Sequence, residues 1–394
     1  MGEGQSFKKT VMLKRNLLVE FIRDYYKSSG KIYLHEPIFV GKEKEYLLDT
    51  INSTFVSSIG EYVTSFEDKI RDFTKSNAAV AVNNGTAAIH LALFISDIKR
   101  NDLVITPSFT FIAVCNVLSH LGAEPIFIDI DKRNLGLCPI SLKNFLETNC
   151  ELNDKKKCVH KKTKKIIKAV VPMNAFGNPV HFDEIKAISK RWNLKVIEDS
   201  AESLGSIYKN KFCGSLSEIG ILSFNGNKII TTGGGGMLLF KSKKIANLAR
   251  HISSTARTSS KLKFSHDRVG FNYRMPNLNA ALGLAQMENI EEYLLKKRKL
   301  AFLYRDFFKD SEYEFINESR NVKSNFWLNS IICNDKKERD DLLKFLNKKS
   351  IFARAPWELM SNLNMFKRNI KDDLKNSKFI QKRLINLPSS VLKN

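Results

Sequence analysis

Between residues 78 and 240, the sequence alternates short apolar runs rich in β-branched residues with segments of helical length. Strands that are apolar on both faces must be covered on both sides, so this pattern predicts βαβ units and a mostly parallel sheet between helices. Seven strands are expected, at residues 78–82, 102–107, 124–130, 167–172, 195–199, 220–224 and 236–240. Helices are expected between several of them, at residues 86–98, 111–121, 139–149 and 182–192.

The flanking segments predict a second, smaller unit after the sheet. Ahead of the sheet, apolar residues at helical spacing predict helices at 41–55 and 65–76. After the sheet, the same spacing predicts helices at 272–308 and 338–349, and a strand-like run lies at 326–333. The expected fold class is therefore α/β, with a large domain whose seven-stranded, mostly parallel sheet is covered by helices, plus a smaller C-terminal α+β domain. The large domain is assigned to residues 1–275 and the small one to residues 276–394.

Apolar and cysteine patterns exclude several classes of protein. No stretch approaches the roughly 20 apolar residues of a membrane-spanning helix, and the N-terminus lacks the pattern of a signal peptide. The six cysteines lie far apart without a CxxC pair, which argues against a zinc site or a disulfide framework. We therefore expect a cytoplasmic protein without a metal ion and without a membrane partner.

The net charge of +23 allows two interpretations. One is a basic regulatory protein that binds nucleic acid. The other is a lysine-rich solvated surface, and it is favoured because the densest run, NDKKKCVHKKTKKIIK at 153–168, has no interleaved aromatic residues for base stacking. This run reads as a surface insertion leading into a strand. We expect no nucleic-acid partner, although a basic surface would attract a phosphorylated small molecule.

Polar residues follow several of the expected strands, where ligands bind in open α/β sheets. Gly85 and Thr86 come directly before a helix and offer backbone N–H groups and a hydroxyl to a phosphate. Phe109 and Phe111 follow the second strand; either both belong to the core or one stacks on a flat ligand. Asp199, which follows Glu198, ends a buried strand, where a carboxylate is costly unless it is paired, for example with a protonated ring nitrogen.

The segment SFNGNKIITTGGGGM, residues 223–237, places Ser223 and Lys228 before four glycines. The spacing does not match a P-loop or the GxGxxG dinucleotide fingerprint, so a phosphate cradle alone does not explain the lysine. The order of a phosphate-type turn, an aromatic residue, a strand-end Asp, and a Ser with a Lys matches pyridoxal phosphate (PLP) chemistry. There, the lysine amine bonds to the cofactor aldehyde, the Asp keeps the ring nitrogen protonated, and the glycines let the backbone approach the cofactor.

Nearly the whole chain resembles the DegT–StrS type nucleotide-sugar aminotransferases, which are fold-type I PLP enzymes. The motifs that carry this resemblance are NNGTAAIHLAL, TPSFTFIA, VPMNAFGNP, EDSAESLGS, SFNGNKIITTGGGGM and GFNYRMPNLNAALGLAQME. The resemblance implies catalysis by Lys228 and Asp199. It implies cofactor binding by Gly85, Thr86, Ala87, Phe111, Asp199, Glu202, Ser223, Lys228 and Arg274, and substrate binding by Asn227 and Arg354.

In this family, Lys228 would bond to PLP, Glu202 would lie near the phenolic oxygen of the cofactor, and Arg274 would reach the phosphate in the other subunit of a homodimer. This chain departs from the family pattern at three places. It has four glycines where Gly-Glu-Gly-Gly is frequent, Glu202 where His or Gln is frequent, and Asn174 where His is frequent. Some members are dehydratases with histidine in place of the lysine, so the presence of Lys228 favours transamination.

Three flanking segments, at 34–67, 353–360 and 385–394, resemble the branch acting on 4-keto sugars of the bacillosamine and legionaminic acid routes. The resemblance implies transfer of an amino group from glutamate to the 4-keto group of a nucleotide-linked 4-keto-6-deoxy (N-acetyl)hexose. A UDP-linked sugar for surface glycans is favoured. The alternatives are a perosamine-type GDP-sugar enzyme and a 3-keto sugar aminotransferase.

Overall fold

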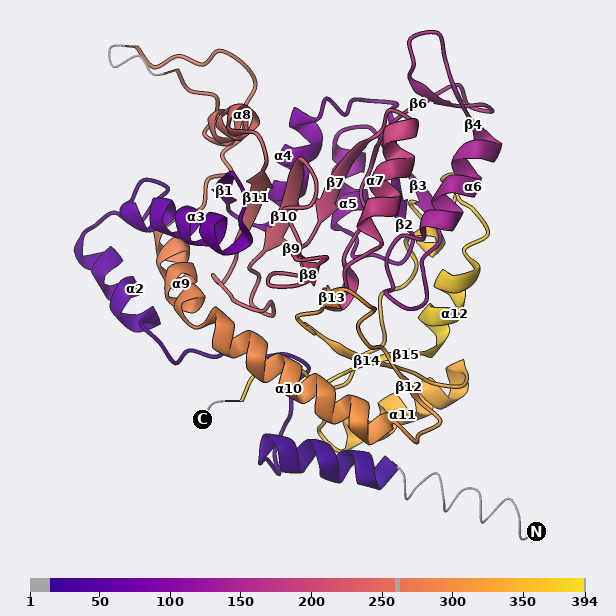
Figure 1. Ribbon diagram of the computed structural model, residues 1–394. Coiled ribbons are helices and arrows are strands. Elements are labelled where there is room, and N and C mark those ends of the chain that lie inside the picture. Colours follow the sequence, from indigo (N-terminus) through magenta and orange to yellow (C-terminus); the bar gives the residue numbers. More distant parts are fainter. Residues whose placement is uncertain (1–14, 259–262, 393–394) are drawn as a thin grey trace.

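The computed structural model describes residues 15–258 and 263–392, and its centre is one large sheet (Figure 1). All seven expected strands are present, with ends within two residues of the predicted ones. They are β1 (Ala78–Val82), β2 (Leu103–Pro107), β3 (Glu124–Ile128), β6 (Ile166–Val170), β7 (Lys195–Asp199), β10 (Ile219–Ser223) and β11 (Gly236–Phe240). Their order in the sheet is β1-β11-β10-β7-β6-β2-β3.

The sheet is mostly parallel, as predicted. Strands β10, β7, β6, β2 and β3 pair in parallel, whereas β11 runs antiparallel to both of its neighbours, β1 and β10. Strand β1 therefore runs in the same direction as β10 and β7. The segments that follow β1, β7 and β10 consequently emerge at the same edge of the sheet, and this edge carries the candidate site.

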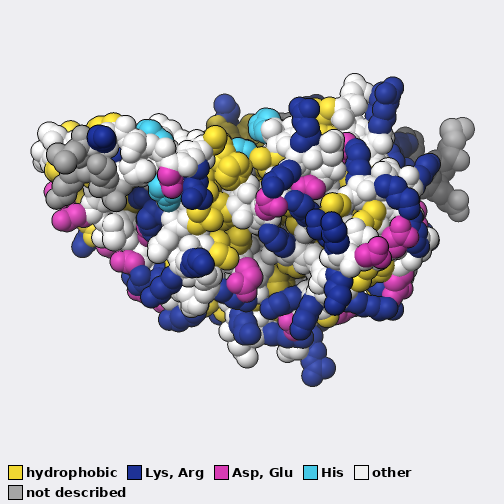
Figure 2. Space-filling model, turned by 90° about the horizontal axis from the view of Figure 1, so that it is seen from above, with side chains coloured by type: hydrophobic (Ala, Val, Ile, Leu, Met, Phe, Trp, Pro, Cys, Tyr) yellow, Lys and Arg dark blue, Asp and Glu magenta, His cyan; other side chains and the backbone are white. Residues whose placement is uncertain are grey.

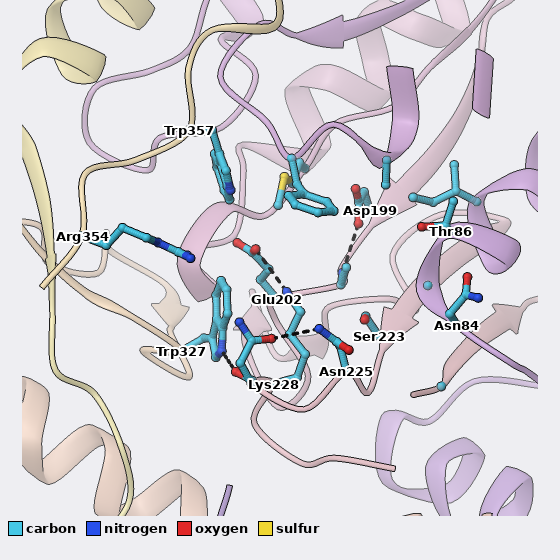
Figure 3. Close-up of a pocket in the computed structure, with 18 residues that line it drawn as sticks. Asn84, Thr86, Asp199, Glu202, Ser223, Asn225, Lys228, Trp327, Arg354 and Trp357 are labelled. Atoms are coloured by element: carbon cyan, nitrogen blue, oxygen red, sulfur yellow. Dashed lines mark hydrogen bonds and ion pairs between the residues drawn. The ribbon is translucent and has the colours of Figure 1, made fainter. Parts of the chain in front are cut away.

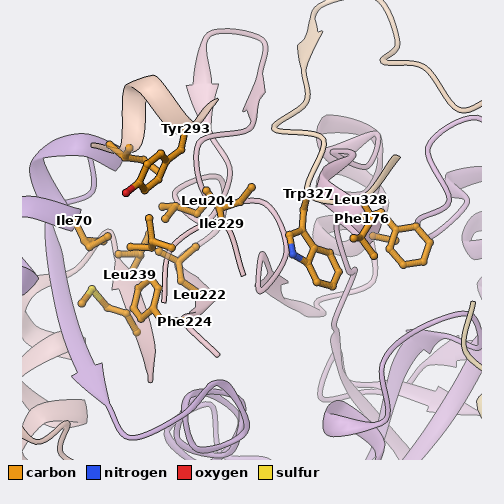
Figure 4. Close-up of a cluster of buried hydrophobic side chains, with 14 of the residues drawn as sticks. Ile70, Phe176, Leu204, Leu222, Phe224, Ile229, Leu239, Tyr293, Trp327 and Leu328 are labelled. Carbon is orange, nitrogen blue, oxygen red and sulfur yellow. The ribbon is translucent and has the colours of Figure 1, made fainter. Parts of the chain in front are cut away.

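Helices cover both faces of the sheet (Figure 1). The bounds of those that follow the strands are α4 (Gly85–Ile95), α5 (Ala113–His120), α6 (Pro139–Asn149), α7 (Phe182–Arg191) and α8 (Lys243–Ser253). Helices α4, α5 and α8 share one apolar cluster with the strands, and α6 and α7 share another. A third cluster, part of which is drawn in Figure 4, joins the sheet to helix α3 (Glu61–Thr74) and to residues of the C-terminal part of the chain.

The lysine-rich run at 153–168 is more ordered than the sequence predicted. Strands β4 (Cys150–Leu152) and β5 (Cys158–His160) form an antiparallel hairpin, and β5 pairs with β6, so the large sheet has nine strands. Its lysine-rich turn is exposed, as expected, and Lys and Arg side chains are spread widely over the face of the molecule that Figure 2 shows. The two strands were missed because three residues are too few to show an alternating pattern.

The flanking helices pack on one another at one side of the sheet. Helices α2 (Glu43–Asn52) and α3 pack against α9 (Asn277–Glu288), which α10 (Ile290–Phe308) follows after a break at Asn289. The predicted helix at 272–308 is therefore two helices. Because α9 lies after residue 275 yet packs on N-terminal helices, the domain boundary at that residue stays a prediction.

The C-terminal part contains a three-stranded antiparallel sheet in the order β12-β14-β15. Its elements are β12 (Glu314–Phe315), β14 (Asn329–Ile332), β15 (Leu384–Leu387), α11 (Lys336–Lys348) and α12 (Lys375–Arg383). A further small sheet joins β13 (Val322–Lys323) to β8 (Ile207–Tyr208) and β9 (Lys211–Phe212), so the C-terminal part is also linked to the loop after β7.

Within the part of the chain that the structure describes, no helix has the length and apolar character needed to cross a membrane. All six cysteines are buried as free thiols. Among these described residues, no group of His, Cys, Asp and Glu side chains is arranged to hold a metal ion.

The carboxylate of Asp129, just after β3, connects the large sheet to helix α12. It accepts hydrogen bonds from the backbone N–H groups of Asn376 and Ser377, both at 2.7 Å, and from the Ser377 hydroxyl at 2.6 Å. The N-cap residue of α12 is Leu374, which has no side-chain acceptor for these groups. Asp129 therefore caps a helix that is more than 240 residues away in the sequence.

Replacing Asp129 by Ala should lower the free energy of unfolding by about 2–4 kcal/mol, because buried donors of α12 would lose a charged acceptor. Urea unfolding would measure this loss. The matched control is Asp373→Ala, since the exposed Asp373 accepts from one backbone N–H only. The control should cost less than about 1 kcal/mol. Equal losses in the two variants would contradict the capping role of Asp129.

Candidate active site

A cavity of about 370 Å³ lies at the carboxyl edge of the sheet, between the sheet and the C-terminal part of the chain (Figure 3). It brings together nine of the eleven residues singled out from the sequence: Gly85, Thr86, Phe111, Asp199, Glu202, Ser223, Asn227, Lys228 and Arg354. Ala87 and Arg274 are not among its lining residues. Side chains that the sequence analysis did not single out complete the wall, including Asn84, Met173, Asn225, Trp327 and Trp357.

One end of the cavity is formed by the first turn of helix α4. The Asn84 side chain caps this helix by accepting the Ala87 N–H at 2.8 Å, so that N–H is already bonded within the protein. The N–H groups of Gly85 and Thr86 lie in the first turn and have no acceptor within a helix. A Cβ on Gly85 would lie 3.0 Å from the Ser223 Cβ, so glycine lets the Ser223 hydroxyl lie beside this helix end. This cradle suits a phosphate group.

The glycine run after Lys228 makes close contacts within the protein, and its predicted approach to the cofactor stays a prediction. A Cβ on Gly236 would lie 2.5 Å from the backbone carbonyl oxygen of Asn84, and a Cβ on Gly235 would lie 2.1 Å from the Thr232 Oγ1. Of the four glycines, only Gly235 lines the cavity. Gly236 therefore lets β11 pack closely on the turn between β1 and α4, and Gly235 leaves room for the Thr232 side chain.

Asp199, at the end of β7, faces the cavity. Burial raises the pKa of its carboxyl group to about 6; the N–H of Ala201, which donates to it at 3.1 Å, opposes this rise, and the neighbouring Glu202 adds to it. A buried carboxylate of this kind is stabilised by an opposite charge. A protonated ring nitrogen in the cavity would supply that charge.

The adjacent Glu198 has a structural role. Burial raises the pKa of its carboxyl group, and the carboxylate accepts hydrogen bonds from the Gly214 N–H at 2.7 Å, the Ser200 hydroxyl at 2.8 Å and the Asn174 amide at 3.1 Å. Asn174 is thus occupied in holding Glu198. Of the two strand-end carboxylates, Asp199 alone lines the cavity.

Lys228 and Glu202 form an ion pair in the cavity wall (Figure 3). The Lys228 Nζ lies 3.2 Å from one Glu202 oxygen, and the other oxygen accepts the Phe176 N–H at 2.9 Å. The same Nζ lies 3.9 Å from the centre of the Trp327 ring. Burial raises the pKa of Glu202, which Lys228 opposes. The lysine amine is therefore held at the surface of the cavity, between a carboxylate and an aromatic face.

The two phenylalanines after β2 have different environments. Phe109 is fully buried and packs edge-on against Phe176 and Trp357, with ring centres 6.1 Å and 5.5 Å away. Phe111 lines the cavity with about half of its surface exposed. Phe109 is thus a core residue, and Phe111 is the ring that is free to stack on a flat ligand.

Two tryptophans from the C-terminal part form the wall near Arg354. The Trp327 indole N–H donates to the Asn227 carbonyl at 2.6 Å, and Trp357 stacks on Phe176 with ring centres 4.7 Å apart. Trp327 lies in a run that was predicted only as a strand, and Trp357 lies in the segment 353–360, whose resemblance did not mark the tryptophan as a site residue. Only the packing of the C-terminal part brings both to the cavity. Asn84, by contrast, precedes a helix in the manner of an N-cap residue, and this signal was visible in the sequence.

Arg274 lies outside the cavity of its own chain. Its backbone bridges to Val82, and its Nε is buried without a hydrogen-bond partner among the described residues. Burial lowers the pKa of its guanidinium group, and the nearby Glu67 opposes this shift. The predicted contact of Arg274 with a cofactor in another subunit stays a prediction.

The cavity fits PLP on the evidence of these side chains. The turn at Gly85 and Thr86 with Ser223 would hold the phosphate, and Phe111 would stack on the ring. Asp199 would pair with the ring nitrogen, and Lys228 would supply the amine for the aldehyde.

Comparisons with known proteins agree with this geometry. Residues 38–392 match the DegT/DnrJ/EryC1/StrS aminotransferase family. The chain is 35% identical over 337 residues to EpsN of Bacillus subtilis (strain 168), described as a pyridoxal phosphate-dependent aminotransferase, covering 85% of this chain and 84% of EpsN. It is 34% identical over 363 residues to GDP-perosamine synthase of Escherichia coli O157:H7, covering 91% and 93% of the two chains.

Among solved structures, PseC of Helicobacter pylori, an aminotransferase of pseudaminic acid biosynthesis, superposes with a TM-score of 0.82 at 22% identity. The alignment covers 91% of this chain and 93% of PseC. This likeness confirms the predicted fold-type I architecture. The protein is a PLP-dependent sugar aminotransferase, and it belongs to the DegT/DnrJ/EryC1/StrS aminotransferase family.

Replacing Asp199 by Asn should stabilise the cofactor-free protein at pH 7 by about 1–3 kcal/mol. The pKa of Asp199 is about 6 in the folded state and 3.8 ordinarily. Between these two pH values, the folded state therefore retains a proton that the unfolded state has lost. Wild-type stability should therefore fall as the pH rises from about 4 to about 6, and the variant should lack this component. Urea unfolding at several pH values measures the difference.

The control for this experiment is Asp154→Asn, which changes an exposed carboxylate in the turn between β4 and β5. It should leave the free energy of unfolding within about 0.5 kcal/mol of wild type. If Asp199→Asn showed no gain in stability at pH 7, this result would contradict the conclusion that burial raises the pKa of Asp199.

Proposed function

We propose that this enzyme transfers the amino group of glutamate to the 4-keto group of a nucleotide-linked 4-keto-6-deoxy (N-acetyl)hexose, with a UDP-linked sugar favoured. The observation that carries the proposal is the placement of four groups on one cavity. The Lys228 amine and the Asp199 carboxylate face it, the α4 N-terminus closes one end, and Arg354 lines another part of its wall.

PLP, when bound, supplies an aldehyde that exchanges amino groups and a ring that withdraws electrons from the reacting carbon. Asp199 keeps a proton on the ring nitrogen, which preserves that electron withdrawal. Gly85, Thr86 and Ser223, which line one part of the cavity, would hold the phosphate, and Phe111 would cover the ring. These groups hold the cofactor in position throughout the reaction.

Lys228 has two roles in this mechanism. Its amine would hold the cofactor through the aldehyde, and its Nζ, when free, would move a proton to or from the reacting carbon as a general base or acid. Glu202, 3.2 Å from that nitrogen, orients it and can accept or return a proton. The indole of Trp327 shields this side of the cavity from water.

The substrate side of the cavity contains groups suited to a sugar nucleotide. Arg354 is exposed and would attract the pyrophosphate, and Asn227 and Trp357 line the wall near it. A GDP-linked keto sugar is the second candidate, because one relative at 34% identity is named GDP-perosamine synthase. A 3-keto sugar remains the third alternative from the sequence.

A panel of nucleotide sugars tests the substrate. Turnover with glutamate should be fastest on a UDP-linked 4-keto-6-deoxy N-acetylhexose, by at least about tenfold over GDP-linked 4-keto and UDP-linked 3-keto sugars. Chromatography and mass spectrometry would identify the amino sugar. Lys228→Ala should give no multiple turnover on any member of the panel. A preference for a GDP-linked or 3-keto sugar would contradict the proposed substrate, and turnover by the Ala variant would contradict the role of Lys228.

We further propose a homodimer in which Arg274 contributes to the neighbouring site. Large apolar side chains are exposed on and around helix α2 and near residue 270; they are Phe39, Val40, Leu48, Ile51, Phe55, Val56, Ile59, Phe264 and Val269. Such a concentration of exposed apolar surface favours an interface. Arg274 follows one of these segments, and its Nε lacks a partner within the described chain.

Mixing two inactive variants tests this arrangement. Lys228→Ala and Arg274→Ala homodimers should each be strongly impaired. After mixing and subunit exchange, half of the dimers would be mixed, and one of their two sites would contain both native residues. Activity should therefore recover to roughly one quarter of the wild-type value. If the mixture stayed inactive while native mass spectrometry showed the mass of the mixed dimer, Arg274 would act within its own chain.

A further inference from the structure

The free amine of Lys228 has a defined resting place in the structure. Its Nζ lies 3.2 Å from Glu202 Oε1 and 3.9 Å from the centre of the Trp327 indole (Figure 3). The carboxylate and the aromatic face approach the same nitrogen, and only about 14% of the lysine side chain is exposed. An ammonium group is attracted by both neighbours.

Trp327 is held rigidly against the turn that carries the lysine. Its indole N–H donates to the carbonyl of Asn227, the residue directly before Lys228, at 2.6 Å. The ring is almost fully buried, and in Figure 4 it lies next to Phe176 and Leu328. The position of the indole is therefore coupled to the backbone of the lysine turn itself.

The backbone around Trp327 is anchored on two sides. Its N–H donates to Asn325 Oδ1 at 2.8 Å, and the Asn325 amide donates to the Glu202 carbonyl at 3.0 Å. Asn325 thereby ties together the two residues that contact the lysine amine. On the other side, the fully buried Lys297 donates to the Trp327 carbonyl at 2.7 Å and to the Ser389 carbonyl.

We propose that Trp327 is a positioning residue for Lys228. Together with Glu202, it holds the lysine ammonium at the cavity wall during the part of the reaction in which this amine is not bonded to the cofactor. This inference rests on the proposed role of Lys228. A lysine side chain has a flexible four-carbon stem, so a docking position keeps the free amine within reach of the reacting carbon. The attraction of the indole acts on the ammonium form, so a deprotonated amine is released for attack.

The test uses the cofactor-free protein and follows the return of the amine to the cofactor. When PLP is added, the Lys228 nitrogen attacks the aldehyde carbon, a C=N bond forms and one water molecule leaves. Stopped-flow absorbance measures the rate. Trp327→Leu should slow this step by about tenfold, and Trp327→Phe, which retains an aromatic face, should stay within about threefold of wild type.

A second readout separates positioning from general damage to the cavity. Pyridoxamine phosphate binds without a covalent bond to Lys228, so its dissociation constant in Trp327→Leu should remain within about twofold of wild type. Trp192→Leu removes a partly buried tryptophan at the end of α7, remote from the cavity, and serves as the matched control. Should Trp327→Leu fail to fold, Trp327→Met replaces it, because the unbranched Met side chain adapts to irregular space and also lacks an aromatic face.

Two outcomes would overturn the proposal. One is a wild-type rate of bond formation in Trp327→Leu. The other is an equal loss of rate and of pyridoxamine phosphate affinity, which would indicate a packing role only. Borohydride reduction of wild-type protein with PLP, followed by peptide mass spectrometry, tests the underlying function separately. If the label is on Lys228 and the rate of C=N bond formation in Trp327→Leu equals that of wild type, only the positioning role of Trp327 is rejected. If the label is on another residue, the role of Lys228 is rejected.

Discussion

The structure depends on the placement of buried carboxylates around a single lysine. Glu198, Asp199 and Glu202 are all nearly inaccessible to solvent, and burial raises the pKa of each. Hydrogen bonds stabilise Glu198, and Lys228 pairs with Glu202. Asp199 is left facing the cavity, with one backbone N–H donating to it. The buried carboxylate of Asp199 is therefore destabilising in the protein alone. A cationic ring beside it would compensate the charge, so binding of the cofactor would stabilise the folded state.

The site is assembled from segments far apart in the sequence because the sheet brings them to one edge. The ends of β1, β7 and β10 supply the helix cradle, the acid and the hydroxyl. The C-terminal part then closes the cavity with Trp327 and Trp357. This closure requires firm docking of the two parts, to which the cap that Asp129 provides for α12 and the anchor that Lys297 provides for residue 327 both contribute.

Much of this arrangement could be predicted because its signals are local. Each of the seven main strands has a mostly apolar centre bounded by turn or helix signals, so their ends were predicted to within two residues. The turn before α4 and the strand-end Asp199 were recognised because their residue types are unusual at those positions. The β4–β5 hairpin and the break at Asn289 were not predicted, since a three-residue strand has too few residues for periodicity and a single non-helical residue leaves helical spacing nearly unchanged.

The sequence by itself determined the class of fold and the cofactor, because the alternation of strands and helices and the ordered motifs of the family are local features of the chain. Through the same motifs it predicted the roles of Lys228 and Asp199. Residue types alone left Phe109 and Phe111, or Glu198 and Asp199, equivalent, and only the family resemblance favoured Phe111 and Asp199. The tertiary structure decided the physical difference: Phe111 and Asp199 line the cavity, whereas Phe109 joins the core and Glu198 is held by backbone groups. Adjacent or alternate residues on a strand or turn look equivalent in a sequence. Their roles separate only when the surrounding segments pack and leave one side chain, and not its neighbour, facing an open space.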